Sequence, residues 1–361
     1  MHPEFTEEQV ALQASVEKFW RAQISLEKLL AWEKEPAGID ASAWRSIAEL
    51  GWFGIGVPSD RGGSGLGLVE VACVLEECAR GLLPRRVSEA VRGAVALAQL
   101  DPQAAELEAL ARGEQRLTLA IDERAARRPE NYSTSFRATP AGPRIVGEKF
   151  CVLDPTADWH LVAAADGSGT AIALVAGENA RCASVRSFDG SEQAVVTYDG
   201  IAAHRIVARG SDGRAKLGAI ERTQTALALA EMIGGMTAAL DATIAYVVER
   251  EQFGQKLAVF QAVQHQVADM ALVLTASRHL AWRAISRLAY GTEQGVELAT
   301  AAAFVSRSFK DVTVAAHHLH GGAGYILEHP LHFHSERAQA LAIRYAAEAD
   351  ALEAVAAELL D

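Results

Sequence analysis

Two glycine-containing stretches contain the residues best suited to bind a ligand. The first reads Arg250-Glu-Gln-Phe-Gly254. The second is a Gly321-Gly-Ala-Gly324 turn, where backbone amides can come close to a phosphate or a ring. Two interpretations of the first stretch stay open. Gly254 ends a helix at the left-handed C′ position, or the Arg, Gln and Phe side chains before it hold a ligand.

Both stretches must be positioned by long helices. From about Leu217 onward the sequence contains four helix-length segments with alanine-rich faces, at 217–252, 257–290, 295–319 and roughly 330–360. Small faces let neighbouring helices approach closely, and a four-helix bundle is the economical arrangement of such segments. The sequence therefore places both glycine-containing stretches between helices of one bundle.

The remainder of the chain divides into two regions. Residues 1–113 have helical periodicity and begin with a capping box at Thr6 and Gln9. From about Gln115 to Arg209, short β-branched runs bounded by Gly, Asp, Asn and Pro predict an antiparallel β domain. The predicted fold is α+β, with an N-terminal helical domain (1–113), a middle antiparallel β domain (114–210) and a C-terminal four-helix bundle (211–361).

Composition excludes several classes of protein. The chain has 361 residues, is 50% apolar and carries a net charge of −12. No basic excess exists to neutralise phosphates, so nucleic acid is not expected as a partner. The four cysteines form no C-x-x-C pair, which indicates reduced thiols. We see no basic-then-apolar leader and no uncharged apolar run of the roughly 20 residues that span a membrane. We expect a cytoplasmic protein without a membrane partner.

A histidine cluster raises the question of a metal site. Six of the eleven histidines lie between 317 and 334. His329, His332 and His334 could be imagined as ligands, but the cluster contains no H-x-x-x-H pair and lacks Asp and Cys partners. We therefore expect no metal, and we assign the cluster to a surface or interface role.

Taken together, the motifs resemble those of the flavin-dependent acyl-CoA dehydrogenases. The resemblance covers essentially the whole chain. It includes the helix–sheet–helix order, the stretch 147–158 in the sheet region, the R-x-x-F-G…F-Q run at 250–261, and His320-Gly-Gly-Ala-Gly-Tyr325. It implies an FAD enzyme that removes a hydride and a proton from Cβ and Cα of an acyl-CoA. The electrons would then pass to an electron-transfer flavoprotein.

In that family, the R-x-x-F-G residues and the Gly-Gly turn reach across a dimer interface to the ADP half of the neighbour's FAD. A guanidinium suits pyrophosphate because its fork donates two hydrogen bonds in a fixed geometry. The resemblance therefore implies cofactor-binding roles for Arg250, Gln252, Phe253, Gln261, His318, Gly321 and Gly322. His318 replaces a glutamine of the family pattern, and it can still donate a hydrogen bond.

The residues that a subunit would use for its own flavin are replaced. Where the family has Lys-x-Trp-Ile-Thr in the sheet domain, this chain has Cys151 and Leu153 at the Trp and Thr positions. The family also places an acidic loop containing Gly and Ser against flavin and CoA. The corresponding stretch 121–131 contains neither Gly nor Ser. The resemblance thus implies that most side chains that would grip the flavin ring are missing.

The catalytic base is also absent from the family's positions. Removing the α-proton of a thioester requires a carboxylate in an apolar pocket that raises its pKa. One family position, counted back from the R-x-x-F-G arginine, falls on Gln224, and the other, after the glycine turn, falls on Tyr345 or Ala346. None of these is acidic. Glu221, one turn before Gln224, is a fallback base, although it could instead be an acid that stabilises a helix N-terminus.

The residues that would reach a neighbour are thus present, whereas those for the chain's own chemistry are replaced. This leads to the hypothesis of a non-catalytic partner in an α2β2 acyl-CoA dehydrogenase, like those acting on steroid side-chain CoA thioesters. The chain would supply FAD-binding residues to a second acyl-CoA dehydrogenase subunit. Two alternatives stay open, namely a self-sufficient homotetrameric enzyme with Glu221 as base and a flavin-free structural protein. Glu231, two turns after Gln224, is expected to be a polar residue of the bundle.

Overall fold

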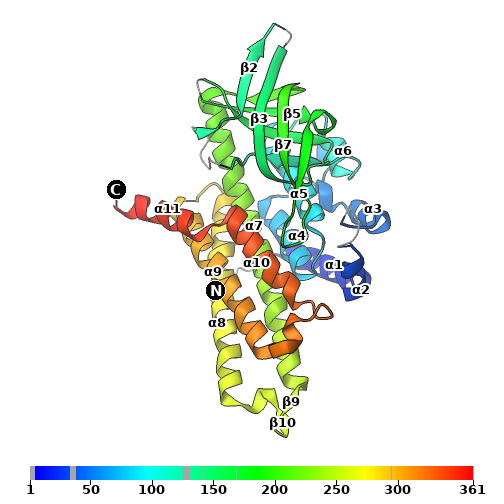
Figure 1. Ribbon diagram of the computed structural model, residues 1–361, viewed down its shortest axis with the longest axis vertical. Helices are drawn as coiled ribbons and strands as arrows, with labels where there is room; N and C mark the ends of the chain where they lie inside the picture. Colours follow the sequence, from blue (N-terminus) through cyan, green and yellow to red (C-terminus); the bar gives the residue numbers. More distant parts are fainter. Residues whose placement is uncertain are drawn as a thin grey trace. The chain divides into compact units, whose positions relative to one another are not determined.

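The computed structural model describes residues 5–32, 38–124, 131–140, 142–167, 169–293 and 295–360. Helices come first along the chain, then the strands of one large sheet, then long helices (Figure 1). This confirms the predicted fold class. The three domain boundaries stay a prediction. Contacts divide the chain into two compact units. We call Met1–Ala31, Leu68–Leu83 and Thr223–Asp361 the bundle unit, and Trp32–Gly67 and Pro84–Arg222 the sheet unit.

The helices are α1 (Glu7–Gln23), α2 (Leu26–Trp32), α3 (Ala41–Glu49), α4 (Leu68–Arg80), α5 (Arg85–Leu100), α6 (Leu107–Ala111), α7 (Gly210–Glu249), α8 (Gln261–Ala289), α9 (Gly295–His320), α10 (Leu331–Tyr345) and α11 (Glu348–Leu360). The strands are β1 (Leu117–Ala120), β2 (Ser135–Thr139), β3 (Gly142–Leu153), β4 (Trp159–Ala165), β5 (Thr170–Ala176), β6 (Arg181–Val185), β7 (Gln193–Ala202), β8 (Arg205–Ala208), β9 (Glu251–Gln252) and β10 (Gln255–Lys256). Two 3₁₀ turns, η5 (Leu257–Val259) and η6 (Gly321–Tyr325), flank the long helices.

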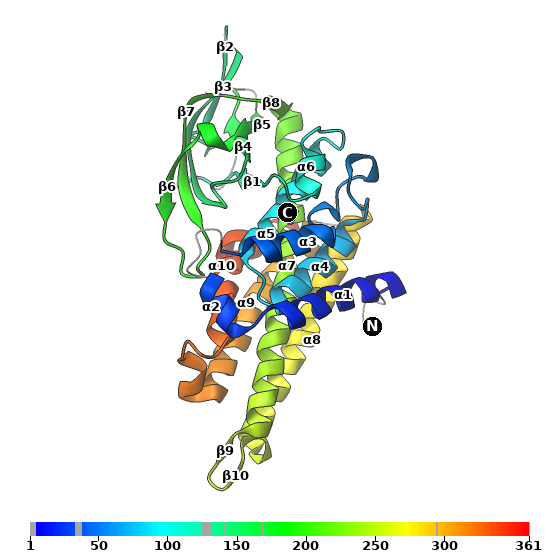
Figure 2. The same ribbon diagram turned by 90° about the vertical axis from the view of Figure 1, so that its right-hand side faces the viewer.

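In the bundle unit, α7 and α8 run side by side and α9 packs against α8, α10 and α11 (Figures 1 and 2). Two adjacent glycines of α7 let other helices approach closely. A Cβ on Gly234 would lie 1.9 Å from the carbonyl oxygen of Glu76 on α4, and one on Gly235 would lie 2.4 Å from the Phe309 ring on α9. The small helix faces seen in the sequence therefore serve close packing, as expected.

Helix α7 is long and apolar enough to cross a membrane by length and composition alone. However, 72% of its most apolar window is buried inside the protein. Buried residues on α7 include Leu227, Met232 and Ile233, each at 0% exposure. This is the pattern of a central bundle helix that is apolar all round.

The sheet unit contains one eight-stranded sheet in the order β6-β7-β3-β2-β4-β5-β8, with β1 paired to β4. Most pairs are antiparallel, as the sequence predicted, whereas β1–β4 and β2–β4 are parallel. One hydrophobic cluster joins the sheet to α5, α6 and the first turns of α7, through residues such as Leu97, Leu107 and Leu217. A second cluster is formed mainly by strand residues, including Val162, Val196 and Tyr198.

Candidate cofactor-binding site

The stretch after α7 is a β-hairpin, and the prediction that Gly254 ends a helix was wrong. Helix α7 already ends at Glu249, and the short strands β9 and β10 then pair in antiparallel register. Phe253 and Gly254 form the two-residue connection, with φ angles of 56° and 80°. Two consecutive positive φ angles are characteristic of a type I′ turn, which matches the twist of a hairpin. Figure 1 shows this hairpin at one end of the bundle unit.

Phe253 occupies the turn at a cost to the chain. Its side chain is 91% exposed, and its ring lies edge-on to that of Phe260, with centroids 6.1 Å apart. A left-handed conformation costs a non-glycine residue about 1–2 kcal/mol. The chain therefore presents an apolar ring at its surface in a strained backbone conformation.

Polar side chains around the hairpin also face outward. Arg250, Gln252 and Gln261 are all exposed. Within the described part of the chain, the Arg250 guanidinium makes no hydrogen bond or ion pair; only its backbone does, to Tyr246 and Leu257. A charged fork is thus presented at the end of the bundle, where an anionic group could bind it in bidentate fashion.

The glycines of the turn η6 differ in the structural constraint that requires a glycine at each position. Gly321 has a φ of 57°, which a side chain rarely adopts. A Cβ on Gly324 would lie 3.0 Å from the Cβ of His320 and 3.2 Å from Nδ1 of His317. Gly322 has neither constraint, because its φ is not left-handed and a Cβ there would meet nothing within 4 Å. The described residues therefore give no structural reason for a glycine at position 322.

Two contacts bring the hairpin and the glycine turn to the same end of the bundle. On α7, one turn before Arg250, the Tyr246 hydroxyl donates a 3.2 Å hydrogen bond to the carbonyl of His320. The Tyr246 and His320 rings also stack with centroids 4.4 Å apart. On α8, Gln266 Oε1 accepts a 3.2 Å hydrogen bond from Nδ1 of the exposed His318. Sequence reasoning missed Tyr246 and Gln266, although the helical spacing of Tyr246 from Arg250 was a usable signal.

We call the exposed end of the bundle unit that carries the seven predicted cofactor-binding residues the clamp surface. These are Arg250, Gln252, Phe253, Gln261, His318, Gly321 and Gly322, and all seven are exposed. The structure thus gathers every one of them on one region of one unit. Their binding role stays a prediction.

The histidine cluster packs behind this surface. His317, His320 and His334 are 8%, 3% and 5% exposed, so the predicted surface role was wrong for these three. His317 bonds Ser335 through Nε2 at 2.6 Å, and burial lowers the pKa of His320 and of His334, the latter to about 3. Nowhere in the described residues do three His, Cys, Asp or Glu side chains come together to hold a metal. His317 and His320, whose pKa values burial lowers, stack on Tyr325 and Tyr246 beside the glycine turn.

The two family positions for the base lie next to each other in the bundle unit. Gln224 is 3% exposed, and its neighbour Thr225 donates a 3.0 Å hydrogen bond to the carbonyl of Tyr345. Neither position contributes a carboxylate. Glu231 is 2% exposed and buried in the bundle, whereas Glu221 is exposed on this chain. A base needs an apolar pocket to raise its pKa, and exposure does not supply one.

In the sheet unit, Cys151 and Leu153 stand at the positions of the family's flavin contacts. Cys151 has a φ of 52° and lies where the pairing of β3 with β7 shifts register. Leu153 is 2% exposed, so its side chain belongs to the interior. Before β2, Glu123 is bonded to the backbone of Ser133. Residues 125–130 of the replaced loop lie outside the described residues.

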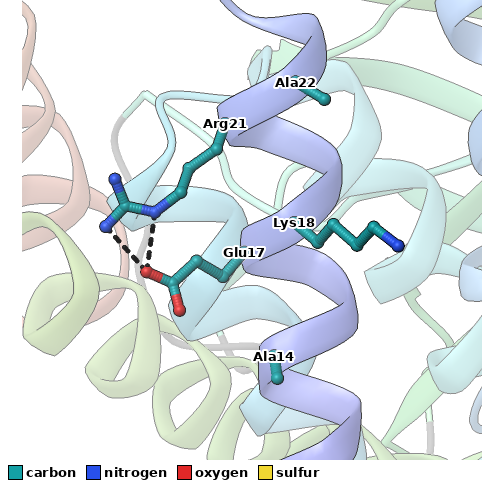
Figure 3. A pocket seen from close by; sticks show the side chains of 5 residues that line it. All are labelled: Ala14, Glu17, Lys18, Arg21 and Ala22. Atoms are coloured by element: carbon teal, nitrogen blue, oxygen red, sulfur yellow. Dashed lines mark hydrogen bonds and ion pairs between the residues drawn. The ribbon is translucent and has the colours of Figure 1, made fainter.

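One shallow depression lies along α1, lined by Ala14, Glu17, Lys18, Arg21 and Ala22 (Figure 3). Arg21 and Glu17 form an ion pair at 2.8 Å across it. All five residues come from a single helix, and none of the predicted site residues is among them. A site for a drug-sized or larger ligand is normally a concave pocket, so we place no chemistry in this depression.

Comparison with known proteins identifies the family. A family description for the N-terminal domain of acyl-CoA dehydrogenases matches residues 6–109, and one for their C-terminal domain matches residues 219–357. Acyl-CoA dehydrogenase FadE28 of Mycobacterium tuberculosis is 32% identical over 297 residues, covering 80% of this chain and 84% of that protein. The chain belongs to the acyl-CoA dehydrogenase family. Members of this family are FAD-dependent oxidoreductases.

Solved structures of the family include assemblies of two different chains. A variant of the Tcur3481-Tcur3483 steroid acyl-CoA dehydrogenase matches with a TM-score of 0.90 and 26% identity, covering 98% of each chain. The ChsE4-ChsE5 complex from Mycobacterium tuberculosis matches with a TM-score of 0.91 and 25% identity, covering 100% of this chain and 99% of the other. Heteromeric acyl-CoA dehydrogenases are therefore among the structural neighbours of this chain.

Proposed function

We propose that this chain is the non-catalytic subunit of a heteromeric, FAD-dependent acyl-CoA dehydrogenase. Its clamp surface contributes residues to FAD held by a catalytic partner subunit, with an α2β2 assembly as the expected form. The observation that carries the proposal is that, among the described residues, no structural role is seen for the exposed Arg250 guanidinium, the 91% exposed Phe253 ring or the open space at Gly322. Each would acquire one if a cofactor of a neighbouring subunit lay against it.

The exposed groups fit the ADP half of FAD. The Arg250 guanidinium would donate two hydrogen bonds to pyrophosphate oxygens, since its donors are not engaged by described residues. Phe253 would pack beside the dinucleotide, and the open space at Gly322 would let the backbone come close. Gln252 and Gln261 can donate further hydrogen bonds, and Nε2 of His318, which Gln266 does not engage, can make one more. FAD, when bound, supplies the hydride acceptor of the reaction.

The absence of a base at the expected positions supports the non-catalytic part of the proposal. Glutamine cannot accept a proton usefully near neutral pH, and Gln224 is buried where the family has a glutamate. Tyr345 and Ala346, at the other family position, also lack a carboxylate. Proton removal from the acyl-CoA would thus fall to the partner subunit.

The substrate and the electron acceptor follow by analogy with relatives. Two structural neighbours are described as a steroid acyl-CoA dehydrogenase and as the ChsE4-ChsE5 complex. We extend this to a CoA thioester of a steroid side chain as the substrate class, and to an electron-transfer flavoprotein as acceptor. The assignment of substrate class and electron acceptor rests on analogy between related folds. Substrate choice itself depends on the shape of the cavity, which we expect to form with the partner.

The test is to express this chain alone and together with a second family member that carries Glu at the position of Gln224. Flavin per assembly and dehydrogenation of an acyl-CoA are the readouts. We expect the lone chain to bind no FAD and to be inactive, and the co-expressed pair to contain FAD and be active. Full flavin loading with dehydrogenation by the lone chain would contradict the proposal. In that case, loss of activity in Glu221→Gln would identify the self-sufficient enzyme. A flavin-free assembly would favour a structural role.

A further inference from the structure

The surroundings of Glu123 in the sheet unit form a feature that the proposed function does not use. The Glu123 carboxylate accepts four hydrogen bonds. Ser133 donates from its backbone nitrogen and from Oγ, each at 2.7 Å, Thr134 from its backbone nitrogen at 3.1 Å, and Lys149 from Nζ at 2.9 Å. Glu123 is 8% exposed, whereas Thr134 and Lys149 are fully buried at 0%.

The donor set suits a carboxylate. One oxygen of Glu123 receives both donors of Ser133, and the other receives the Thr134 amide and the Lys149 ammonium. Only an ionised carboxylate offers two acceptor oxygens and a full negative charge in so small a group. Burial alone would raise the pKa of Glu123, but the hydrogen bond and charge of Lys149, aided by Ser133, lower it to about 2.

Other contacts hold the donors in place without Glu123. The Lys149 ammonium also donates to the carbonyl of Ile121 at 2.8 Å, and it lies 3.7 Å from the centre of the Tyr132 ring. Thr134 Oγ1 donates to the carbonyl of Glu148 at 3.0 Å. A Cβ on Gly147 would lie 2.5 Å from Cα of Thr134, so β3 packs directly against this segment. Because the donors belong to β3 and the residues just before β2, the carboxylate is brought to them by a different segment, the one after β1.

We propose that Ser133, Thr134 and Lys149 form a carboxylate-binding site that Glu123 fills as an internal ligand, which fixes residues 121–124 against β3. A small free carboxylate then occupies the same site once the Glu123 side chain is removed. In the unaltered chain, these four donors are not available to an external anion. The proposal concerns the sheet unit alone, so its test does not depend on whether the chain forms a heteromer or contacts FAD.

The test is chemical rescue of Glu123→Ala with formate. Removing the carboxylate leaves a buried ammonium without its counter-ion, so the midpoint of thermal unfolding should fall. Sodium formate should raise that midpoint in a saturable way, relative to sodium chloride at equal ionic strength. The same formate titration should leave the unaltered protein unchanged.

Two further variants keep the result interpretable. Glu123→Gln retains an oxygen and fills the space, so formate should not stabilise it. The double variant Glu123→Ala with Lys149→Met removes the cation of the site and should also be insensitive to formate. If Glu123→Ala does not fold in chloride, its refolding yield in formate replaces the unfolding midpoint. The proposal is overturned if formate fails to rescue Glu123→Ala, or if it stabilises the unaltered protein or either control equally.

Discussion

Replacing Arg250 with alanine tests the clamp surface most directly. Arg250 is exposed, and across the described residues its guanidinium has no partner, so the lone chain should lose no more than about 0.5 kcal/mol of unfolding free energy. In the assembly, the guanidinium is proposed to bind pyrophosphate. A hydrogen bond to a charged group contributes about 1.5–3 kcal/mol, which corresponds to FAD binding weakened about 10- to 150-fold.

The assay is the FAD dissociation constant of the co-expressed assembly, measured by titrating FAD into its apo form. A matched control is Arg283→Ala, which removes another exposed arginine of the bundle unit, one that pairs with Glu297 at 3.0 Å. The control should leave FAD affinity unchanged. Arg250→Lys keeps the charge but not the fork, so its affinity should fall between the other two. An intact Arg250→Ala assembly with unchanged FAD affinity would refute the reasoning.

Three other predictions follow from the same structure. Gly322→Ala should leave the unfolding midpoint of the lone chain unchanged, since its Cβ meets nothing within 4 Å, yet reduce the flavin content of the assembly. Phe253→Gly should stabilise the lone chain in urea by about 1 kcal/mol by removing left-handed strain, while weakening FAD binding. Burial lowers the pKa of His160 to about 4 and of His334 to about 3. The folded chain therefore binds these protons less readily than the unfolded chain. Unfolding free energy should fall as pH drops below about 6.5, by up to about 1.4 kcal/mol per pH unit for each histidine, and urea titrations of His334→Phe should show a shallower dependence.

The order of helices and strands was predictable because it depends on local periodicity. The Phe253–Gly254 pair alone does not predict the hairpin, since a glycine after an apolar residue fits a helix C′ position as well as a type I′ turn. The deciding signal lies on either side of that pair. Glu251 and Lys256 are direct cross-strand partners and form a 2.8 Å ion pair. Opposite charges placed symmetrically about a two-residue turn favour a hairpin, and this pattern was readable in the sequence.

Burial of the histidine cluster was beyond local reasoning. His317 and His320 lie on α9, whereas His334 lies on α10, and their burial depends on how those helices fold back across the glycine turn. The spacing of the histidines along the chain raised the question of metal ligands, but tertiary packing sets the direction in which each side chain points. The stacking of Tyr246 on His320 likewise joins helices far apart in the sequence. Such contacts determine which residues of a motif face outward, and only those can reach a second chain.

Some exposed residues of the clamp surface are explained by the fold of this chain, and others are not. Gly321 is explained by its φ angle and Gly324 by the histidines packed against it, so both follow from folding alone. Among the described residues, a Cβ on Gly322 would meet nothing within 4 Å, and Phe253 lowers the stability of the chain through its left-handed conformation and its exposed ring. Gly322, which no described contact requires, and Phe253, which destabilises the chain, call for an explanation outside the chain. The proposed cofactor of a neighbouring subunit would explain both residues, whereas a flavin-free structural protein would explain neither.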